Sequence, residues 1–395
     1  MHTAALAPPD SIGATRVRSF GIVSSFPPTS CGIATFSAAL AAGLVGGGAS
    51  VNVVRCGQAP DTEDVVVVGS LDDPTDLGHR RAIAALNRNE VVIVQHEYGL
   101  YDGADGESVI DVIASIAAPV VVVAHTVLTK PTTNQRRVLQ QVCRHADAIV
   151  VMTETARQRL LVGYDVVRSK VHVIPHGAAT PLAAPSASQR RPGTPPRVLT
   201  WGLLGPGKGI EWAIDAFAEL GDIHPAPTYT IAGATHPKVR ERSGEAYREM
   251  LVDRAERSGA RSSVSFDDSY RDLESLTELI RSADLVVLPY DSADQVTSGV
   301  LVDAVAAGCP VVSTAFPHAV ELLASGAGMV VPQRDPAALA KAIRAVLTDD
   351  DLRRGMAAEA RRLAPDLSWA AVAGRYDSLG ARLIADRSVQ RPVTS

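Results

Sequence analysis

Residues 285–314 read LVVLPYDSADQVTSGVLVDAVAAGCPVVST. Two short apolar runs, 285–290 and 310–314, enclose a stretch with helical spacing that starts after Ser298. Continuous apolar runs of this length are typical of parallel strands that are buried on both faces. A serine before a helix accepts a hydrogen bond from the first turn. The stretch therefore predicts a strand–helix–strand unit within a parallel sheet.

The same alternation extends over most of the chain. Short runs rich in Val and Ile alternate with longer amphipathic stretches, which predicts an α/β protein. In the first half, the predicted strands are 19–24, 51–55, 91–95, 120–125, 148–152 and 171–175. In the second half, they are 198–202, 229–233, 264–267, 285–290 and 310–314, with a short piece at 329–332.

Chain length and one proline-rich segment indicate two domains. A chain of 395 residues is too long for one ordinary core. The segment 178–196 contains five prolines and has no periodicity, so it is predicted to be a linker. Two Rossmann-like domains in tandem, at 17–177 and 197–365, are the simplest account. The last segment, 366–386, has the apolar spacing of a helix.

Composition excludes several classes of protein. Hydrophobic residues make up 46% of the chain and charged residues 21%, which is typical of a soluble globular protein. The net charge of −5 argues against a nucleic-acid binder. The four cysteines form no CxxC pair, which favours reduced thiols in a cytoplasmic protein. Residues 1–16 are interpreted as a disordered tail and not a signal peptide, and no apolar run approaches the roughly 18 residues of a membrane span. Peripheral contact with a membrane stays open.

Two glycine-containing turns follow predicted strands. The sequence GLLGPGKG at 202–209 nearly matches a Walker motif, but Gly209 stands where a hydroxyl residue would hold magnesium, so an NTPase is not expected. Lys208 at the start of a helix is suited to a diphosphate, and a solvated surface lysine is the alternative. Near the N-terminus, Gly32 begins a predicted helix whose N–H groups could approach an anion; a plain tight turn is the alternative.

The helix after Ser298 offers a second group of anion-binding N–H donors, because the first turn of a helix leaves its backbone donors unpaired. Asp303 lies one to two turns inside this helix. A carboxylate there could accept two hydrogen bonds from ribose hydroxyls. An ordinary amphipathic helix is the alternative.

Two histidines lie at predicted strand ends, where ligands bind in open parallel sheets. His125 ends the run VVVVAH, and His96, followed by Glu97, ends the run VVIVQH. A histidine satisfied by packing is the alternative for each. A further pair, His172 and His176, directly precedes the linker and is interpreted as part of the interdomain hinge.

Three segments, FPPTSCGIATF (26–36), LLGPGKGI (203–210) and DAVAAGCPVV (303–312), resemble glycosyltransferase family 4 in their order and separation. The resemblance covers nearly the whole chain. It implies the GT-B fold, in which two Rossmann-like domains face an interdomain cleft and a C-terminal helix crosses back to the first domain. It also implies a retaining hexosyltransferase of carbohydrate metabolism. The donor would be a nucleotide sugar of UDP-glucose or GDP-mannose type, and the acceptor a sugar, a glycolipid or another hydroxyl compound.

The resemblance further implies roles for single residues. His125 would touch the transferred sugar near its reacting carbon, and His96 and Glu97 would lie on the acceptor side. Asp303 would stand for the second acid of the family's E-x7-E pair and bind ribose. The donor diphosphate and sugar would contact Gly32, Lys208, Gln295, Ser298, Gly299 and Val300.

Two positions depart from the family pattern. Gln295 replaces the first acid of the E-x7-E pair, so no carboxylate can act there, and Leu203 stands where many members have an arginine beside the phosphate lysine. A sugar phosphorylase, a nucleotide-sugar epimerase and a non-catalytic sugar-nucleotide binding protein therefore stay as alternatives. No metal ion and no cofactor are expected. The expected location is the cytoplasm, with peripheral contact at the inner face of the membrane left open.

Overall fold

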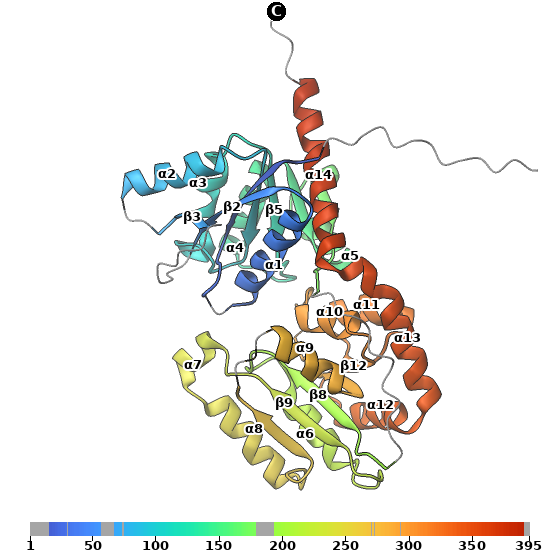
Figure 1. Ribbon diagram of the computed structural model, residues 1–395. Helices are drawn as coiled ribbons and strands as arrows, with labels where there is room; N and C mark the ends of the chain where they lie inside the picture. The colour runs from blue at the N-terminus through green and yellow to red at the C-terminus, as the bar shows by residue number, and fades with distance from the viewer. Residues whose placement is uncertain are drawn as a thin grey trace, which may run out of the picture.

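The computed structural model describes residues 16–29, 31–56, 67–72, 75–178, 193–269, 271, 273–292 and 294–390. These residues form two parallel β-sheets flanked by helices (Figure 1), which confirms the predicted pair of Rossmann-like domains. The predicted tail, apart from Arg16, and most of the predicted linker lie outside the described residues.

Within the described residues, the first sheet has seven parallel strands in the order β3-β2-β1-β4-β5-β6-β7. They are β1 (Ser19–Ser24), β2 (Ser50–Arg55), β3 (Val67–Ser70), β4 (Val91–His96), β5 (Val120–Ala124), β6 (Ala148–Val151) and β7 (Val171–Val173). The predicted strands match all of them except β3. This edge strand has only four residues, one of them glycine, and none is fully buried, so its apolar signal is weak.

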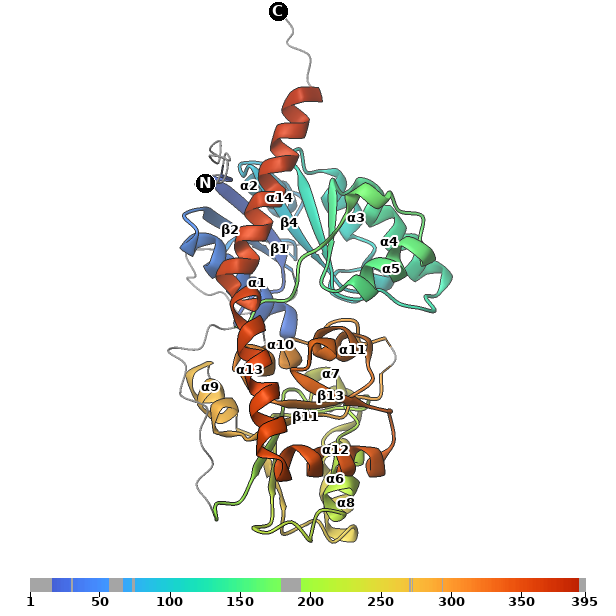
Figure 2. The same ribbon diagram turned by 90° about the vertical axis from the view of Figure 1, so that its right-hand side faces the viewer.

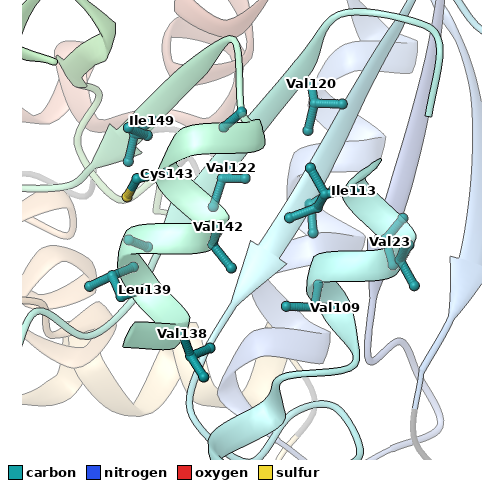
Figure 3. Packing of buried hydrophobic residues seen from close by; sticks show 14 of the residues in the cluster. Val23, Val109, Ile113, Val120, Val122, Val138, Leu139, Val142, Cys143 and Ile149 are labelled. Atoms are coloured by element: carbon teal, nitrogen blue, oxygen red, sulfur yellow. The ribbon is translucent and has the colours of Figure 1, made fainter. Parts of the chain in front are cut away.

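Helices cover both faces of this sheet, because alternate side chains of each strand point to opposite faces. Figure 3 shows Val120 and Val122 of β5 packed under the helices α3 and α4. Val121 and Val123 belong to the core on the other face, together with residues of α1 and α14. The helices of the first domain are α1 (Gly32–Gly46), α2 (Asp76–Leu86), α3 (Val109–Ala114), α4 (Thr133–His145) and α5 (Glu154–Gly163).

The second sheet repeats this strand order as β10-β9-β8-β11-β12-β13, again with parallel pairing. Its strands are β8 (Arg197–Trp201), β9 (Thr228–Ala232), β10 (Val264–Asp267), β11 (Leu285–Leu288), β12 (Val311–Thr314) and β13 (Gly328–Val331). Its helices are α6 (Ile210–Ala218), α7 (Pro237–Ser243), α8 (Ala246–Arg257), α9 (Leu273–Ser282), α10 (Gly299–Ala306), α11 (Pro317–Leu322), α12 (Pro336–Thr348) and α13 (Asp350–Leu367). The strand order reverses between β8 and β11, where sheets of this kind bind ligands.

The C-terminal helices connect the two domains. Figure 2 shows α13 along the second domain and α14 (Trp369–Gln390) along the first. At their junction, the N–H of Ala178 donates to the carbonyl of Leu367 at 2.7 Å. Farther along α14, Tyr376 is buried in the first domain, and Asp377 accepts from the N–H of Val17 at 2.9 Å. The last helix therefore packs on the first domain.

Candidate functional site

A pocket lies where the two domains meet. It is lined by two residues that follow β5 in the first domain and by residues of the loop between β11 and α10 in the second. The lining residues are His125, Thr126, Ser292, Asp294, Gln295, Val296 and Thr297. The fold thus brings the predicted residues His125 and Gln295 into one pocket.

The loop between β11 and α10 is held against the first domain. Asp294 accepts from the hydroxyl of Thr129 at 2.7 Å and pairs with Arg159 at 3.3 Å. The hydroxyl of Thr153 donates to the carbonyl of Val296 at 3.1 Å, and the side chain of Val296, only 2% exposed, belongs to the core of the first domain. These contacts fix the loop as one wall of the pocket.

Glu321 of α11 makes a second contact between the domains. Its carboxylate accepts from the N–H groups of Glu154 at 2.7 Å and Thr155 at 2.9 Å, at the start of α5. A carboxylate at a helix N-terminus is favoured both by the unpaired N–H donors and by the helix dipole. Figure 1 shows α5 and α11 adjacent at this side of the junction.

The start of α10 is built as predicted, with Ser298 as the capping residue. Its hydroxyl accepts from the N–H of Leu301 at 3.3 Å, and its own N–H donates to Nδ1 of His318 at 2.8 Å. Among the described residues, the N–H groups of Gly299 and Val300 have no partner. Two donors are therefore available to an anion at this helix start.

His318 is a site residue that the sequence analysis missed. The residue is 4% exposed, and burial lowers its pKa to about 3, so the ring is neutral and its Nδ1 can accept from the N–H of Ser298. Its backbone N–H donates to the carbonyl of Gln295 at 3.4 Å. His318 therefore holds both ends of the turn that leads into α10. The side chain of Gln295 also braces this turn, because it donates to the carbonyl of Thr297.

Lys208 lies in a turn that requires glycine. Gly209 has φ of 61°, and a Cβ on it would lie 2.0 Å from the carbonyl oxygen of Pro289. The Nζ of Lys208 lies 4.3 Å from the ring centroid of Tyr290, which itself stacks on Phe316. This cation–π contact positions the ammonium, and the N–H donors that point away from the ring stay available to a ligand. Lys208 therefore lies next to Tyr290, from which the loop that forms the pocket wall begins.

The ring of His125 has a fixed orientation. Its Nε2 lies 2.7 Å from Oε1 of Gln95, and in the tautomer that makes this hydrogen bond Nε2 carries the proton. Nδ1 then presents its lone pair. Burial lowers the pKa of His125 to about 3, with smaller contributions from His176 and His96, and the ring packs edge-on against Phe36 at 5.0 Å. The histidine is therefore a neutral hydrogen-bond acceptor.

The two predicted acceptor-side residues lie in different surroundings. Glu97 accepts from the hydroxyl of Thr126, a pocket residue, at 2.5 Å. Burial raises the pKa of Glu97, and the charge of Lys238 from α7 of the other domain partly opposes this. His96 is only 1% exposed and does not line the pocket, and its ring nitrogens have no partner among the described residues.

The remaining predicted residues lie as follows. Gly32 begins α1 with open space where its side chain would be, and Asp303 is half-buried in the second turn of α10. The four cysteines are free. The roles of all these site residues stay predictions.

The described residues contain neither a candidate metal site nor a candidate membrane span. Within those ranges, His, Cys, Asp and Glu form no group of three or more that could hold a metal ion. None of the described helices has the length and apolar character of a membrane span.

Solved structures with the same architecture define the class. HepE of Anabaena in complex with UDP has a TM-score of 0.70 and 18% identity, and the match covers 95% of this chain and 100% of that one. Sucrose-phosphate synthase of Thermosynechococcus elongatus has a TM-score of 0.72 and 19% identity, covering 93% and 100%. Two Rossmann-like sheets with a shared junction and a returning C-terminal helix are the GT-B fold.

Sequence comparisons give the family. The model for Glycosyltransferase Family 4 matches residues 31–180, and the model for Glycosyl transferases group 1 matches residues 185–363. The D-inositol 3-phosphate glycosyltransferase of Corynebacterium glutamicum is 30% identical over 270 residues, 66% of this chain and 63% of that protein. The glycogen synthase of Mycobacterium tuberculosis is 30% identical over 236 residues, 58% and 53% of the two chains. The chain belongs to the family 4 glycosyltransferases, and it spans less than two thirds of the length of these relatives.

Proposed function

We propose that this protein transfers a hexose from a nucleotide sugar to a hydroxyl group, with retention of the anomeric configuration and without a metal ion. The observation that carries the proposal is the composition of the pocket. The neutral His125 of one domain faces the loop that leads into the capped start of α10 in the other. A sugar in this pocket could contact the histidine while its diphosphate reaches the helix.

The residues of the second domain suit a leaving diphosphate. The N–H groups of Gly299 and Val300 and the ammonium of Lys208 would meet the negative charge that develops as the bond between the anomeric carbon and the phosphate oxygen breaks. The acceptor hydroxyl would form its bond on the same face, and its proton would pass to the departing phosphate oxygen. Asp303, farther along α10, would bind the ribose hydroxyls.

The comparisons suggest which ligands to test first. HepE has been crystallised with UDP and with UDP-glucose, and the Corynebacterium relative is named for D-inositol 3-phosphate. UDP-glucose and GDP-mannose are therefore the first donors to test. Sugars, polyol phosphates and glycolipids are the first acceptor classes.

The proposal is tested by thermal unfolding with a panel of nucleotide sugars, followed by transfer assays with the one that binds. A ligand at a hundredfold excess over its Kd should raise the free energy of unfolding by about 2.7 kcal/mol. A panel without any stabilising member contradicts the proposal. Binding without turnover identifies a non-catalytic binding protein, and phosphate-dependent cleavage of a disaccharide identifies a phosphorylase.

Transfer should be unaffected by EDTA, because Lys208 and backbone donors would take the place of a metal ion at the diphosphate. The measurement compares initial rates of nucleoside-diphosphate release before and after chelation. A rate that EDTA abolishes and that returns only with magnesium or manganese contradicts the metal-free mechanism.

The Asp303→Asn variant should bind the donor more weakly but fold normally, since an amide of similar size keeps the packing of α10. The expected loss is about 1.5 to 3 kcal/mol of binding free energy, as for a hydrogen bond to a charged group. Calorimetry with the donor and the melting temperature of the variant are measured together. Normal donor affinity in a destabilised variant would make Asp303 a structural residue.

A further inference from the structure

His176 lies beside the start of α10, although the sequence indicates only a hinge residue. Its Nε2 lies 3.0 Å from the position that a Cβ on Gly299 would occupy. The N–H groups of Gly299 and Val300 at this helix start have no partner among the described residues. The histidine therefore borders the site proposed for the donor diphosphate.

One hydrogen bond fixes the tautomer of His176. Its Nδ1 lies 2.6 Å from the carbonyl oxygen of Gly177, which can only accept, so Nδ1 carries the proton. In the neutral ring, Nε2 then presents a lone pair toward the start of α10. A lone pair beside a phosphate oxygen is repulsive, whereas a protonated Nε2 would donate a charge-assisted hydrogen bond.

Among the described residues, no charged side chain shifts the pKa of His176. The helices α1 and α14 present Phe36 at 5.0 Å and Trp369 at 5.6 Å between ring centroids. The titratable groups that face it from the described elements are His125 at the end of β5 and His318 of α11, and both are neutral rings. Burial lowers the pKa of His176 to about 4, so the ring is neutral before a ligand binds.

We propose that His176 takes up a proton from solvent when the donor binds and holds the diphosphate through an Nε2–H···O hydrogen bond. The inference rests on the proposed function. The bound diphosphate supplies the negative charge that raises the proton affinity of the ring. The resulting imidazolium supplies a positive charge at the diphosphate, in addition to the ammonium that Lys208 would contribute there. The proton leaves again when the nucleotide is released.

The sign of the pH dependence follows from linkage. The bound state holds one proton more than the free state, so donor affinity falls as pH rises from the pKa of the free ring to that of the bound ring. The slope is at most about tenfold per pH unit. Above the pKa of the bound ring, affinity becomes independent of pH.

The test is calorimetry of UDP-glucose binding, and separately of GDP-mannose binding, from about pH 5.5 to 8. Neither ligand has a phosphate that titrates in this range, and buffers of different ionisation enthalpy report the protons taken up. The wild type should take up part of a proton per ligand at acidic pH. The His176→Gln and His176→Asn variants should lose this uptake and the pH slope, with about tenfold weaker binding at the acidic end.

The matched control is His172→Gln. His172 lies four residues earlier on β7, and burial lowers its pKa as well. This variant should keep the proton uptake of the wild type. The inference is overturned if the wild type binds the donor without proton uptake. It is also overturned if proton uptake persists in the His176 variants. Either result leaves the proposed function standing. A wild type that binds neither nucleotide sugar overturns both.

Discussion

Replacing Lys208 with alanine is expected to weaken nucleoside-diphosphate binding by about 1.5 to 3 kcal/mol, roughly 10- to 150-fold in Kd. The ammonium lies over the ring of Tyr290, and the loop that follows this tyrosine forms a wall of the pocket. The alanine variant should keep its turn, because Gly209 and not the lysine side chain determines the backbone there.

The effect of Lys208→Ala is measured by calorimetry with UDP and with GDP. The matched control is Lys341→Ala on the exposed side of α12, which removes the same charge away from the pocket and should leave Kd unchanged. Equal affinity of the Lys208 variant and the wild type would remove the glycine–lysine turn from the donor site. Equal weakening by both variants would assign the effect to net charge.

The alternation of apolar runs predicted the fold because the strands are buried on both faces. The predicted limits of β1 agree with the observed strand, which is buried from its second residue to its last. The edge strand β3 shows the limit of this signal. An edge strand pairs on one side only and keeps residues such as Val68 exposed, so its sequence lacks a continuous buried run.

Local signals also predicted parts of the site. Ser298 caps α10 through a bond to a residue three positions away, and the glycines around Lys208 form a turn within one segment. Such features depend on neighbouring residues, so the sequence contains them directly. His318 carried a comparable signal, since it lies close after the buried strand β12, as His125 follows β5.

Contacts between distant residues could not be predicted in this way. Glu321 binds the start of α5 across 166 and 167 positions of sequence, and Asp294 binds Thr129 across 165. No helical or strand periodicity in the sequence connects such residues, because they come together only when the two domains pack against each other. The same holds for Phe36, whose ring contacts His125, His176 and Trp369 at 5.0 Å each.

Phe36 contacts both the segment between the domains, at His176, and the pocket residue His125. Trp369 begins the helix that returns to the first domain, and its ring lies against Gly177, where a Cβ would approach it to 2.3 Å. His176 directly precedes Gly177 in the chain, and its ring lies beside Gly299 at the start of α10. A change in the angle between the domains would therefore move the groups around His125 and the diphosphate site together.

Replacing His125 with alanine is expected to lower kcat by about 30- to 1000-fold, which corresponds to about 2 to 4 kcal/mol. Donor binding should change little. The neutral ring presents Nδ1 toward a ligand, and Gln95 fixes its orientation. A hydroxyl of the donor sugar that donates to Nδ1 would orient the reacting carbon, and such a contact contributes most as the transition state forms.

The decisive comparison is turnover and nucleotide affinity measured on the same folded His125→Ala variant. The matched control is His145→Ala, which removes an exposed histidine from the end of α4 and should leave both quantities unchanged. A fall in kcat with unchanged Kd places His125 at the reacting sugar. Near-normal turnover would assign the ring to packing against Phe36 and move the sugar site elsewhere at the junction. A loss of donor affinity with unchanged kcat would instead show that the ring stabilises the ground state and the transition state equally, since only interactions that strengthen in the transition state change kcat.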